Sequence, residues 1–332
     1  MIISKTPYRI SFFGGGTDYP SWYLKNGGTV ISSTIDKYIY FSCKNLPPFF
    51  KHKHRIVWSN IELVKNFDSI KLKPARELLK HFNIKGGIEL HYEGDLPAMS
   101  GMGSSSVFVV GMMNLLNSYC GKKISKKNLA KKSIFFEQKI LREAVGSQDQ
   151  IAATYGGFNK IIFNKGGSFK VKPFLLKWKT IQRLDNNLIL LYTGLKRTAH
   201  DIASSYINKL QSSKKINMLN ILNLAQEGEK ALLNNELDNF ASLLHESWLE
   251  KRELDKSIST SKIDDIYKTA IEKGAMGGKL LGAGGGGFFL FYVPKNIQKK
   301  FIKSLKKMII IPFKFNSEGS EIMFNRYEDS VI

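Results

Sequence analysis

Three glycine-rich stretches hold the residues of this chain best suited to binding an anion. They read "FFGGGTDYP" (12–20), "SGMGSSS" (100–106) and "GGKLLGAGGGGFFLF" (277–291). Glycine has no Cβ, so backbone N–H groups in such a stretch can approach a ligand closely. Where a helix follows, its N-terminus adds a partial positive charge, and phosphate is the usual occupant of such a site. The three stretches therefore indicate phosphate chemistry.

The second stretch lies directly before a long apolar run, "VFVVGMMNLL". This switch from polar to apolar predicts a buried helix from about Ser104 to Tyr119. One serine would be enough to cap such a helix. Three serines after two glycines favour phosphate binding at its N-terminus instead.

The third stretch contains Gly282, Gly284 and Gly287 in the spacing G-x-G-x-x-G. A dinucleotide-binding fingerprint must open a helix inside a βαβ unit. These glycines run into the strand pattern "FFLFYV", so NAD binding is rejected. No Lys-Ser or Lys-Thr follows a glycine loop, which rejects a P-loop as well. The stretch is interpreted as a tight loop packed against a ligand or another loop.

The elements around these stretches are a mixture of strands and helices. β-branched and aromatic content predicts strands at "TPYRISFF", "YIYFSC", "GGIELHYEGDLP" and "GGFNKIIFN" in the first half, and at "LILLYTG" and "GGFFLFYVP" in the second. Helices are expected at about 126–143, with Ser125 as the cap, and at about 198–211, 216–234, 236–253 and 261–273. The segment 165–185 is expected to be irregular and basic. It is the candidate boundary between two domains, 1–175 and 176–332.

Length and composition fit a two-domain globular protein. The chain has 332 residues, of which 43% are hydrophobic. No apolar run reaches the roughly 18 residues that a membrane helix needs, and the first residues lack a signal-peptide core. Cys43 and Cys120 match no zinc or redox spacing. A cytoplasmic protein with reduced thiols and no membrane partner is expected.

The formal net charge of +22 raises a nucleic-acid-binding alternative. Only 8 of the 50 basic residues are arginine, the residue that base readout favours, and no aromatic-basic interleaving is present. The lysines are spread along the whole chain, which favours a solvated basic surface. A basic cleft for phosphorylated ligands fits the same charge.

Taken in order, the three glycine-rich stretches resemble the three motifs of the GHMP kinases, with "PYRISFFGGGTDY", "PAMSGMGSSSV" and "KLLGAGGGGFFLF" as the matching segments. The resemblance covers nearly the whole chain. It implies an α+β, two-domain fold with a ribosomal-protein-like N-terminal α/β domain, a ferredoxin-like C-terminal α+β domain and the active site between them. It also implies an ATP-dependent kinase that uses Mg²⁺.

Within that family, "GGGTDYPSWY", "GSQDQIAATYGGFNKIIF" and "YTGLKRTAHDI" look most like the members that phosphorylate the anomeric hydroxyl of heptose 7-phosphate. Such an enzyme would make a 1,7-bisphosphate for GDP-heptose synthesis. Another sugar 1-kinase such as a fucokinase is the nearest alternative, and mevalonate or homoserine kinase is a further one. Galactokinases carry Glu and His where this chain has Gly15 and Gly16, which argues against galactose.

The resemblance assigns roles residue by residue. It places the ATP phosphates at Gly101, Met102, Gly103, Ser104, Ser105, Ser106, Gly284 and Gly285. It implies Mg²⁺ ligation by Ser104 and Glu137, and catalysis by Asp149 beside Arg9. It implies sugar contacts from Gly15, Gly16, Thr17 and Asp18, and a contact of Arg197 with the substrate phosphate.

Several of these residues have an ordinary structural alternative. Glu137 could be a surface charge on its helix, and Asp149 a helix cap. Asp18 could form an Asx-turn after the glycines, and Arg197 could be a solvated cation. A carboxylate that accepts hydrogen bonds from two sugar hydroxyls favours the binding role for Asp18. Oligomeric state stays open.

Overall fold

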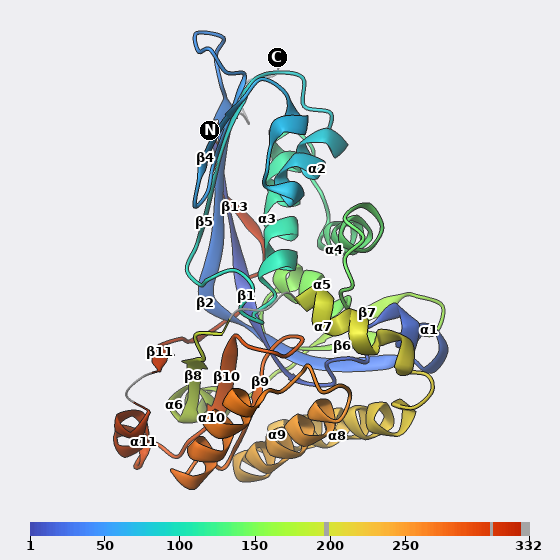
Figure 1. Cartoon of the computed structure of the whole chain (residues 1–332), viewed down its shortest axis with the longest axis vertical. Coiled ribbons are helices and arrows are strands. Elements are labelled where there is room, and N and C mark those ends of the chain that lie inside the picture. Colours follow the sequence, from blue (N-terminus) through green and yellow to red (C-terminus); the bar gives the residue numbers. More distant parts are fainter. Residues whose placement is uncertain (196–198, 306–307, 327–332) are drawn as a thin grey trace.

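The computed structural model describes residues 1–195, 199–305 and 308–326. The larger of its two sheets has nine strands, seven from residues 2–173 and two from the last residues of the chain (Figure 1). The strands of this sheet are β1 (Ile2–Phe13), β2 (Gly28–Asn45), β3 (His54–Val57), β4 (Ile61–Val64), β5 (Ile88–Gly94), β6 (Asn159–Phe163), β7 (Phe169–Pro173), β12 (Phe315–Asn316) and β13 (Glu321–Asn325). The main path runs β13-β1-β2-β5-β3-β4, while β6 and β12 also pair with β2. Only the β3–β5 pair is parallel among the described strand pairs.

Strand β2 is long enough to pair with a different strand at each of its ends. Its first residues, 28–32, pair with β6, and its last residues, 39–45, pair with β5. The β1–β2 register shifts twice, once after Pro7 and once after Ser11. Such shifts bend a strand and re-aim its side chains. The second shift falls directly before the first glycine-rich stretch.

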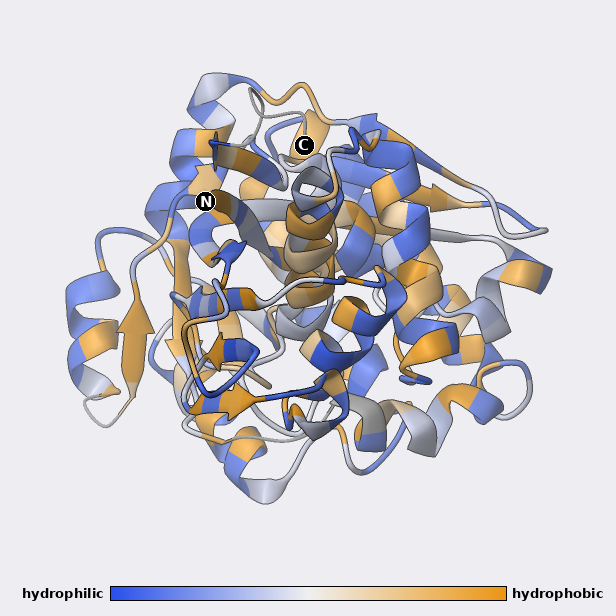
Figure 2. Ribbon diagram, turned by 90° about the horizontal axis from the view of Figure 1, so that it is seen from above, coloured by the Kyte–Doolittle hydropathy of each residue, from blue (hydrophilic) through white to orange (hydrophobic). Residues whose placement is uncertain are grey.

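Helices cover one face of the nine-stranded sheet (Figure 1). These are α2 (Lys73–His81), α3 (Ser104–Tyr119), α4 (Lys126–Phe135) and α5 (Gln148–Tyr155). Helix α3 packs on β1 and β2 and is buried on almost all sides, because its sequence is apolar from Val107 to Met113. Helix α4 continues into a π-helical turn, Phe136–Ile140. Figure 2 shows hydrophobic residues gathered in the middle of the molecule, while the helices at its rim carry both hydrophilic and hydrophobic residues.

The second half contains a four-stranded antiparallel sheet in the order β11-β8-β10-β9. Its strands are β8 (Leu188–Tyr192), β9 (Gly277–Leu280), β10 (Phe288–Tyr292) and β11 (Ile309–Ile311). The helices of this half are α6 (Trp178–Asn187), α7 (Ala199–Tyr206), α8 (Lys215–Leu233), α9 (Leu237–Arg252), α10 (Ser261–Glu272) and α11 (Gln298–Ser304). Helix α9 packs on β9, and α8 packs on α9 and on β1 and β2. The pair α8–α9 therefore joins the second sheet to the first.

Local predictions from the sequence are confirmed where the periodicity was strong. Helix α3 spans the residues expected, and Ser125 caps α4 by accepting a hydrogen bond from the N–H of Asn128. Each of the four helices expected after residue 198 is present within a few residues, although α7 is followed by a 3₁₀ turn. Across the described residues, no helix combines the length and apolar character that a membrane crossing requires.

Two expectations differ from the structure. The segment 165–185 was expected to be irregular, but it holds β7 and most of α6, since its short apolar spacing gave too weak a pattern to recognise. The expected second domain, 176–332, does not keep its last strands. The short strands β12 and β13 return to pair with β2 and β1 of the first sheet. Pairing over such a distance in the chain leaves no local sequence signal.

Candidate active site

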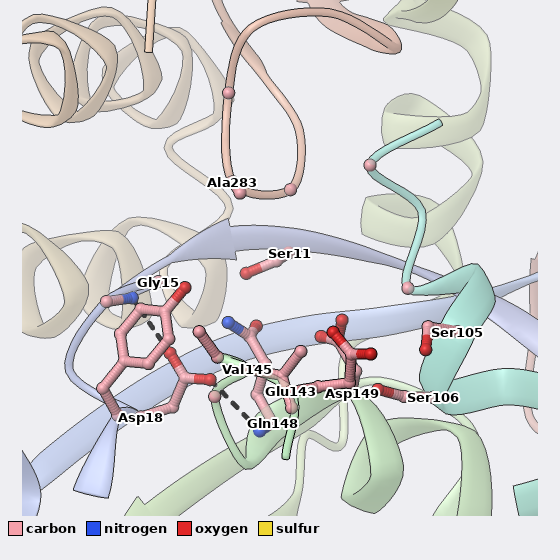
Figure 3. Close-up of a pocket in the computed structure, with 18 of the residues that line it drawn as sticks. Ser11, Gly15, Asp18, Ser105, Ser106, Glu143, Val145, Gln148, Asp149 and Ala283 are labelled. Atoms are coloured by element: carbon pink, nitrogen blue, oxygen red, sulfur yellow. Dashed lines mark hydrogen bonds between the residues drawn. The ribbon is translucent and has the colours of Figure 1, made fainter. Parts of the chain in front are cut away.

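A cavity of about 650 Å³ lies where the two halves meet, and all three glycine-rich stretches line it. The second and third stretches touch directly: the N–H of Phe288 donates to the carbonyl oxygen of Ser100 at 3.2 Å. A Cβ on Gly282 would lie 2.4 Å from the Cα of Gly101, so this contact requires glycine. Figure 3 shows Ala283 at the tip of the third loop, facing Ser11 and Asp149 across the cavity.

Arg9 and Asp149 form a two-point ion pair at the centre of the cavity. The guanidinium Nε and Nη2 atoms of Arg9 donate to the two carboxylate oxygens of Asp149 at 2.7 and 2.8 Å. The third guanidinium nitrogen donates to the carbonyl oxygen of Gly101 at 3.0 Å. Arg9 is buried on β1, whereas the Asp149 side chain keeps 21% exposure at the first turn of α5. This geometry fixes the carboxylate and leaves it accessible to a ligand.

Gly103 brings the start of α3 against this ion pair. Its φ of +77° lies in the left-handed region that favours glycine. A Cβ at this position would lie 3.0 Å from a carboxylate oxygen of Asp149. The N-terminus of α3 therefore approaches the catalytic candidate as closely as its backbone allows.

Asp18 is buried beside the cavity and is held by backbone N–H groups. One of its oxygens accepts from Gly16 at 2.9 Å and the other from Gln148 at 3.2 Å, as Figure 3 shows. Burial, followed by the negative charge of Asp149, raises the pKa of the Asp18 carboxyl, and the two backbone hydrogen bonds oppose that shift. The Gly16 contact reaches two residues back along the chain, whereas an Asx-turn binds the N–H two residues further on, so the contact is not the turn of the structural alternative. Asp18 thus shapes the loop and also lines the cavity.

The other residues of the first stretch divide into two groups. Gly15 and Gly16 line the cavity. Thr17 does not: it is fully buried, and its hydroxyl donates to the carbonyl oxygens of Gly14 and Thr29 at 2.7 and 3.0 Å. In this structure Thr17 fastens the loop rather than facing the cavity.

Glu137 lies fully buried on the π-helical turn beneath the start of α3. The Ser105 hydroxyl donates to one of its oxygens at 2.8 Å, and the Gln150 amide donates to the other. Burial raises the pKa of the Glu137 carboxyl to about 7, with the hydrogen bonds from Ser106, Gln150 and Ser105 acting in the opposite direction. Glu137 is therefore no surface charge.

The serines at the start of α3 differ in their partners. The hydroxyl of Ser104 accepts a hydrogen bond from the N–H of Met99 at 3.2 Å, whereas the hydroxyls of Ser105 and Ser106 hydrogen-bond to Glu137. All three serines line the cavity. A carboxylate next to hydroxyl groups is a set of hard oxygen donors, which suits Mg²⁺. The residues present therefore fit a magnesium ion, with Glu137 and a serine of this group to hold it.

The remaining predicted phosphate contacts are only partly on the cavity wall. Gly101 and Gly284 line it, whereas Met102 is fully buried and Gly285 donates its N–H to the carbonyl oxygen of Ile258. Arg197, predicted to hold the substrate phosphate, lies outside the described residues.

Sequence reasoning missed several residues of the cavity wall. Lys251 on α9 and Lys279 on β9 both line it and are almost completely buried. Their ammonium groups donate to backbone carbonyls, Lys279 to Phe12 at 2.7 Å and Lys251 to Leu280 at 2.9 Å. For Lys279 the sequence did offer a signal, because a single lysine stands between glycines and two leucines in "GGKLL". Lys251 stands in a charged helix end and gave none. The segment 141–146 and Tyr206 also line the cavity.

The fold and the site define a class of protein. Two α+β halves enclose a cavity between glycine-rich loops, and a carboxylate–arginine ion pair lies on its wall. Sequence models of the GHMP kinase N-terminal and C-terminal domains match residues 70–157 and 229–309. The chain belongs to the GHMP kinases and is an ATP-dependent kinase.

Relatives narrow this class to sugar kinases. The chain is 30% identical to the D-glycero-alpha-D-manno-heptose 7-phosphate kinase of Campylobacter jejuni, over 96% of this chain and 97% of that protein. It is 27% identical to the L-fucokinase/L-fucose-1-P guanylyltransferase of Bacteroides fragilis, over 90% of this chain but 35% of that protein.

A solved structure of a D-glycero-D-manno-heptose 1-phosphate kinase from Bacteroides thetaiotaomicron is similar in fold, with a TM-score of 0.80 at 22% identity, covering 98% of this chain and 99% of that one. The predicted α+β fold and the predicted kinase class are confirmed.

Proposed function

We propose that this sugar kinase transfers the terminal phosphate of ATP to the anomeric hydroxyl of D-glycero-D-manno-heptose 7-phosphate. The product would be the 1,7-bisphosphate, a precursor for GDP-heptose and a cell-surface glycan. The observation that carries the proposal is the likeness to the Campylobacter jejuni enzyme along nearly the whole of both chains. A bacterial cytoplasm would supply both substrates.

The cavity supports a division of labour among its residues. Asp149 would accept the proton of the attacking hydroxyl at one of its carboxylate oxygens, a contribution of roughly 10²–10⁴ in rate. Arg9 would keep that carboxylate oriented and balance charge as the hydroxyl oxygen becomes negative. The backbone N–H groups at 101–106 would hold the phosphates of ATP.

Asp18 and the glycines beside it would orient the sugar ring. The carboxylate accepts hydrogen bonds, so it can bind two neighbouring hydroxyls. Gly15 and Gly16 leave room next to it, where a side chain would narrow the cavity. Selection of one anomer would follow from a ring held in one orientation against Asp149.

A magnesium ion would be held by Glu137 with Ser104 or its neighbour Ser105. When bound, it would offset negative charge on the phosphates of ATP. The hydroxyl–carboxylate contact at 2.8 Å supports Ser105 as a partner of Glu137, and the family resemblance supports Ser104.

A panel of sugars and sugar phosphates tests the substrate. Heptose 7-phosphate, unphosphorylated heptose, L-fucose, galactose and mevalonate would each be supplied with ATP and Mg²⁺, and ADP release recorded. Fast release with heptose 7-phosphate is expected. Phosphorus NMR of the product should show a phosphate coupled to the anomeric proton. Preference for unphosphorylated L-fucose would favour the fucokinase alternative, which the likeness to the Bacteroides fragilis protein supports.

A nucleic-acid-binding role is the weaker candidate. It rests on the net charge of +22 alone and would leave the three converging glycine loops without a function. A gel-shift series at rising salt concentration would detect it.

A further inference from the structure

Two buried lysines in the cavity wall are not used by the mechanism above. Lys251 stands in the last turn of α9, and Lys279 stands on β9, just before the third glycine loop. Their relative exposures are 9% and 4%. Burying an ammonium group is costly unless an opposite charge accompanies it. The described residues place no carboxylate within ion-pair distance of either lysine.

Backbone carbonyls are the hydrogen-bond partners of the two lysines, and the ring of Trp248 lies 5.8 Å from the Lys251 ammonium group. Lys279 donates to the carbonyl oxygen of Phe12, which directly precedes the first glycine loop. Lys251 donates to the carbonyl oxygens of Leu280 and Gly282, which flank the entry to the third glycine loop. The lysine pair thus sits between two loops that face the ligand. A protonated lysine has three donors, so each retains at least one beyond these contacts.

Charged residues of both signs share the cavity with the pair. The positive charge of Arg9 on β1 acts on both lysines, and the charge of Lys279 acts on Lys251. Acids also line the cavity, namely Asp18, Glu143, Asp149 and Asp201, but none of them forms an ion pair with either lysine among the described residues, and Arg9 binds both oxygens of Asp149. On β10 the residue paired with Lys279 is Leu290, which carries no charge. The two ammonium groups therefore lie beside a further positive charge, that of Arg9, and neither has a carboxylate partner among the described residues.

We propose that Lys251 and Lys279 form a binding site for a phosphate dianion. A dianion would provide the opposite charge that both buried ammonium groups lack, and charge-assisted hydrogen bonds to phosphate oxygens are among the stronger kinds. The two lysines line the same cavity as Arg9, so the phosphate that they bind would belong to one of the substrates of this enzyme.

Two phosphates could bring this chemistry. One is the phosphate already present on the sugar, in which case the inference rests on the proposed function. The other is the terminal phosphate of ATP, in which case it rests only on the kinase class. A single experiment distinguishes the sugar phosphate from the terminal phosphate of ATP.

The empty site should hold its lysines partly unprotonated. Burial lowers the pKa of Lys279 to about 7, and the charge of Arg9 acts in the same direction. Burial and then the charges of Lys279 and Arg9 hold the pKa of Lys251 well below its usual range. A bound dianion would oppose these effects. Ligand binding at pH 8 should then take up protons from solution.

The test compares wild type with Lys279→Met and Lys251→Met by calorimetry. Four probes are titrated: heptose 7-phosphate, unphosphorylated heptose, a non-hydrolysable ATP analogue and ADP. Lys5→Met serves as the matched control, because it removes one well-covered lysine whose partners are Glu318 and Glu321, away from the cavity wall. Circular dichroism checks that each variant is folded.

The expected loss is about 10- to 100-fold in affinity for one phosphorylated probe, with its less phosphorylated partner unaffected. A loss for heptose 7-phosphate but not heptose assigns the sugar phosphate. A loss for the ATP analogue but not ADP assigns the terminal phosphate. Equal losses on all four probes, or no loss, would overturn the site. If wild type binds neither sugar, the proposed substrate fails and the nucleotide pair alone decides the lysine site.

A measurement on wild type alone guards against a misfolded variant. Calorimetry of the same probes in buffers of different ionisation enthalpy gives the number of protons taken up. Net uptake at pH 8 is expected with the probe that reaches the lysines, since a phosphate monoester is already a dianion there. The absence of uptake with both phosphorylated probes would contradict the proposal.

Discussion

Two pairs of charged residues line the cavity, and their charges are balanced in opposite ways. Arg9 and Asp149 have opposite charges and bind each other at two points, at 2.7 and 2.8 Å. Lys251 and Lys279 have like charges; within the described chain their hydrogen bonds go to backbone carbonyls, and Lys251 also lies over the ring of Trp248. The first pair is balanced before any ligand arrives. The second is balanced only by an anion, which is why the first suits orientation and catalysis and the second suits binding.

The contrast between the two pairs predicts that one governs the rate of phosphate transfer and the other the affinity for a phosphate. Damage to the ion pair should lower the rate of phosphate transfer and leave ligand binding nearly intact. Damage to the lysine pair should weaken binding of one phosphate and alter how stability depends on pH. Four changes test the contrast.

The largest effect is expected from Gly103→Val, which should abolish ATP turnover. The new side chain would crowd the carboxylate of Asp149, 3.0 Å from its Cβ, and would strain a backbone with φ of +77°. Turnover is measured by ADP release. Gly121→Val is the matched control, because Gly121 also has a positive φ, +66°, but has nothing within 4 Å of its Cβ position. Normal turnover in Gly103→Val would contradict the site.

Asp149→Asn should come next, with kcat lowered by about 10²–10⁴ and nucleotide affinity almost unchanged. The amide keeps the shape of the side chain but accepts a proton poorly. Steady-state kinetics and nucleotide titration separate the two quantities.

Asp264→Asn controls for the structural alternative to Asp149. Asp264 is also an acid in the first turn of a helix, α10, and also binds an arginine, Arg252, at 2.9 Å. It does not line the cavity. Loss of affinity for ATP in Asp149→Asn, with kcat intact, would show that the role is wrong.

Glu137→Gln should raise the Mg²⁺ concentration needed for half-maximal rate by roughly 10- to 100-fold, the range seen when support of a metal site is removed. The rate at saturating Mg²⁺ should fall less. Magnesium titrations of activity measure both. Glu62→Gln is the control, since Glu62 is also a buried acid that accepts hydrogen bonds, but its side-chain partner is Trp58 and not a serine of the cavity wall. An unchanged Mg²⁺ response would remove Glu137 from the metal site.

The smallest effect concerns stability and belongs to the lysine pair. The folded pKa of Lys279, about 7, lies below that of an unfolded lysine, so the unfolded chain binds more protons between these values. Stability should therefore rise with pH above about 7, by up to roughly 1.4 kcal/mol per pH unit for one lysine, and fall as pH returns to 7.

Lys279→Met should flatten that rise, and Lys5→Met should not. Denaturant unfolding at pH 7, 8 and 9 without ligand measures it. If Lys279→Met leaves the rise of unfolding free energy with pH unchanged, Lys279 is charged throughout this range. The account of the lysine pair would then be wrong.

The sequence alone identified the parts of this site that have local patterns. Helix α3 begins at Ser104 because glycines and serines give way to an apolar run there. The three glycine-rich stretches were recognisable as ligand loops, and their order indicated the kinase family that the relatives confirm. Arg9 and Asp149 were chosen through that resemblance, and the structure joins them across 140 positions of the chain.

Only the tertiary structure decided which side chains share the cavity. Lys279 meets the carbonyl of Phe12 from 267 positions away, and β13 returns to the first sheet from the far end of the chain. It also decided that Ser105 contacts Glu137 and that Thr17 fastens its own loop. Hydrophobic spacing and turn residues act over a few positions and can be read in order. Burial of a charge depends on what the distant chain packs against it, and no local pattern records that.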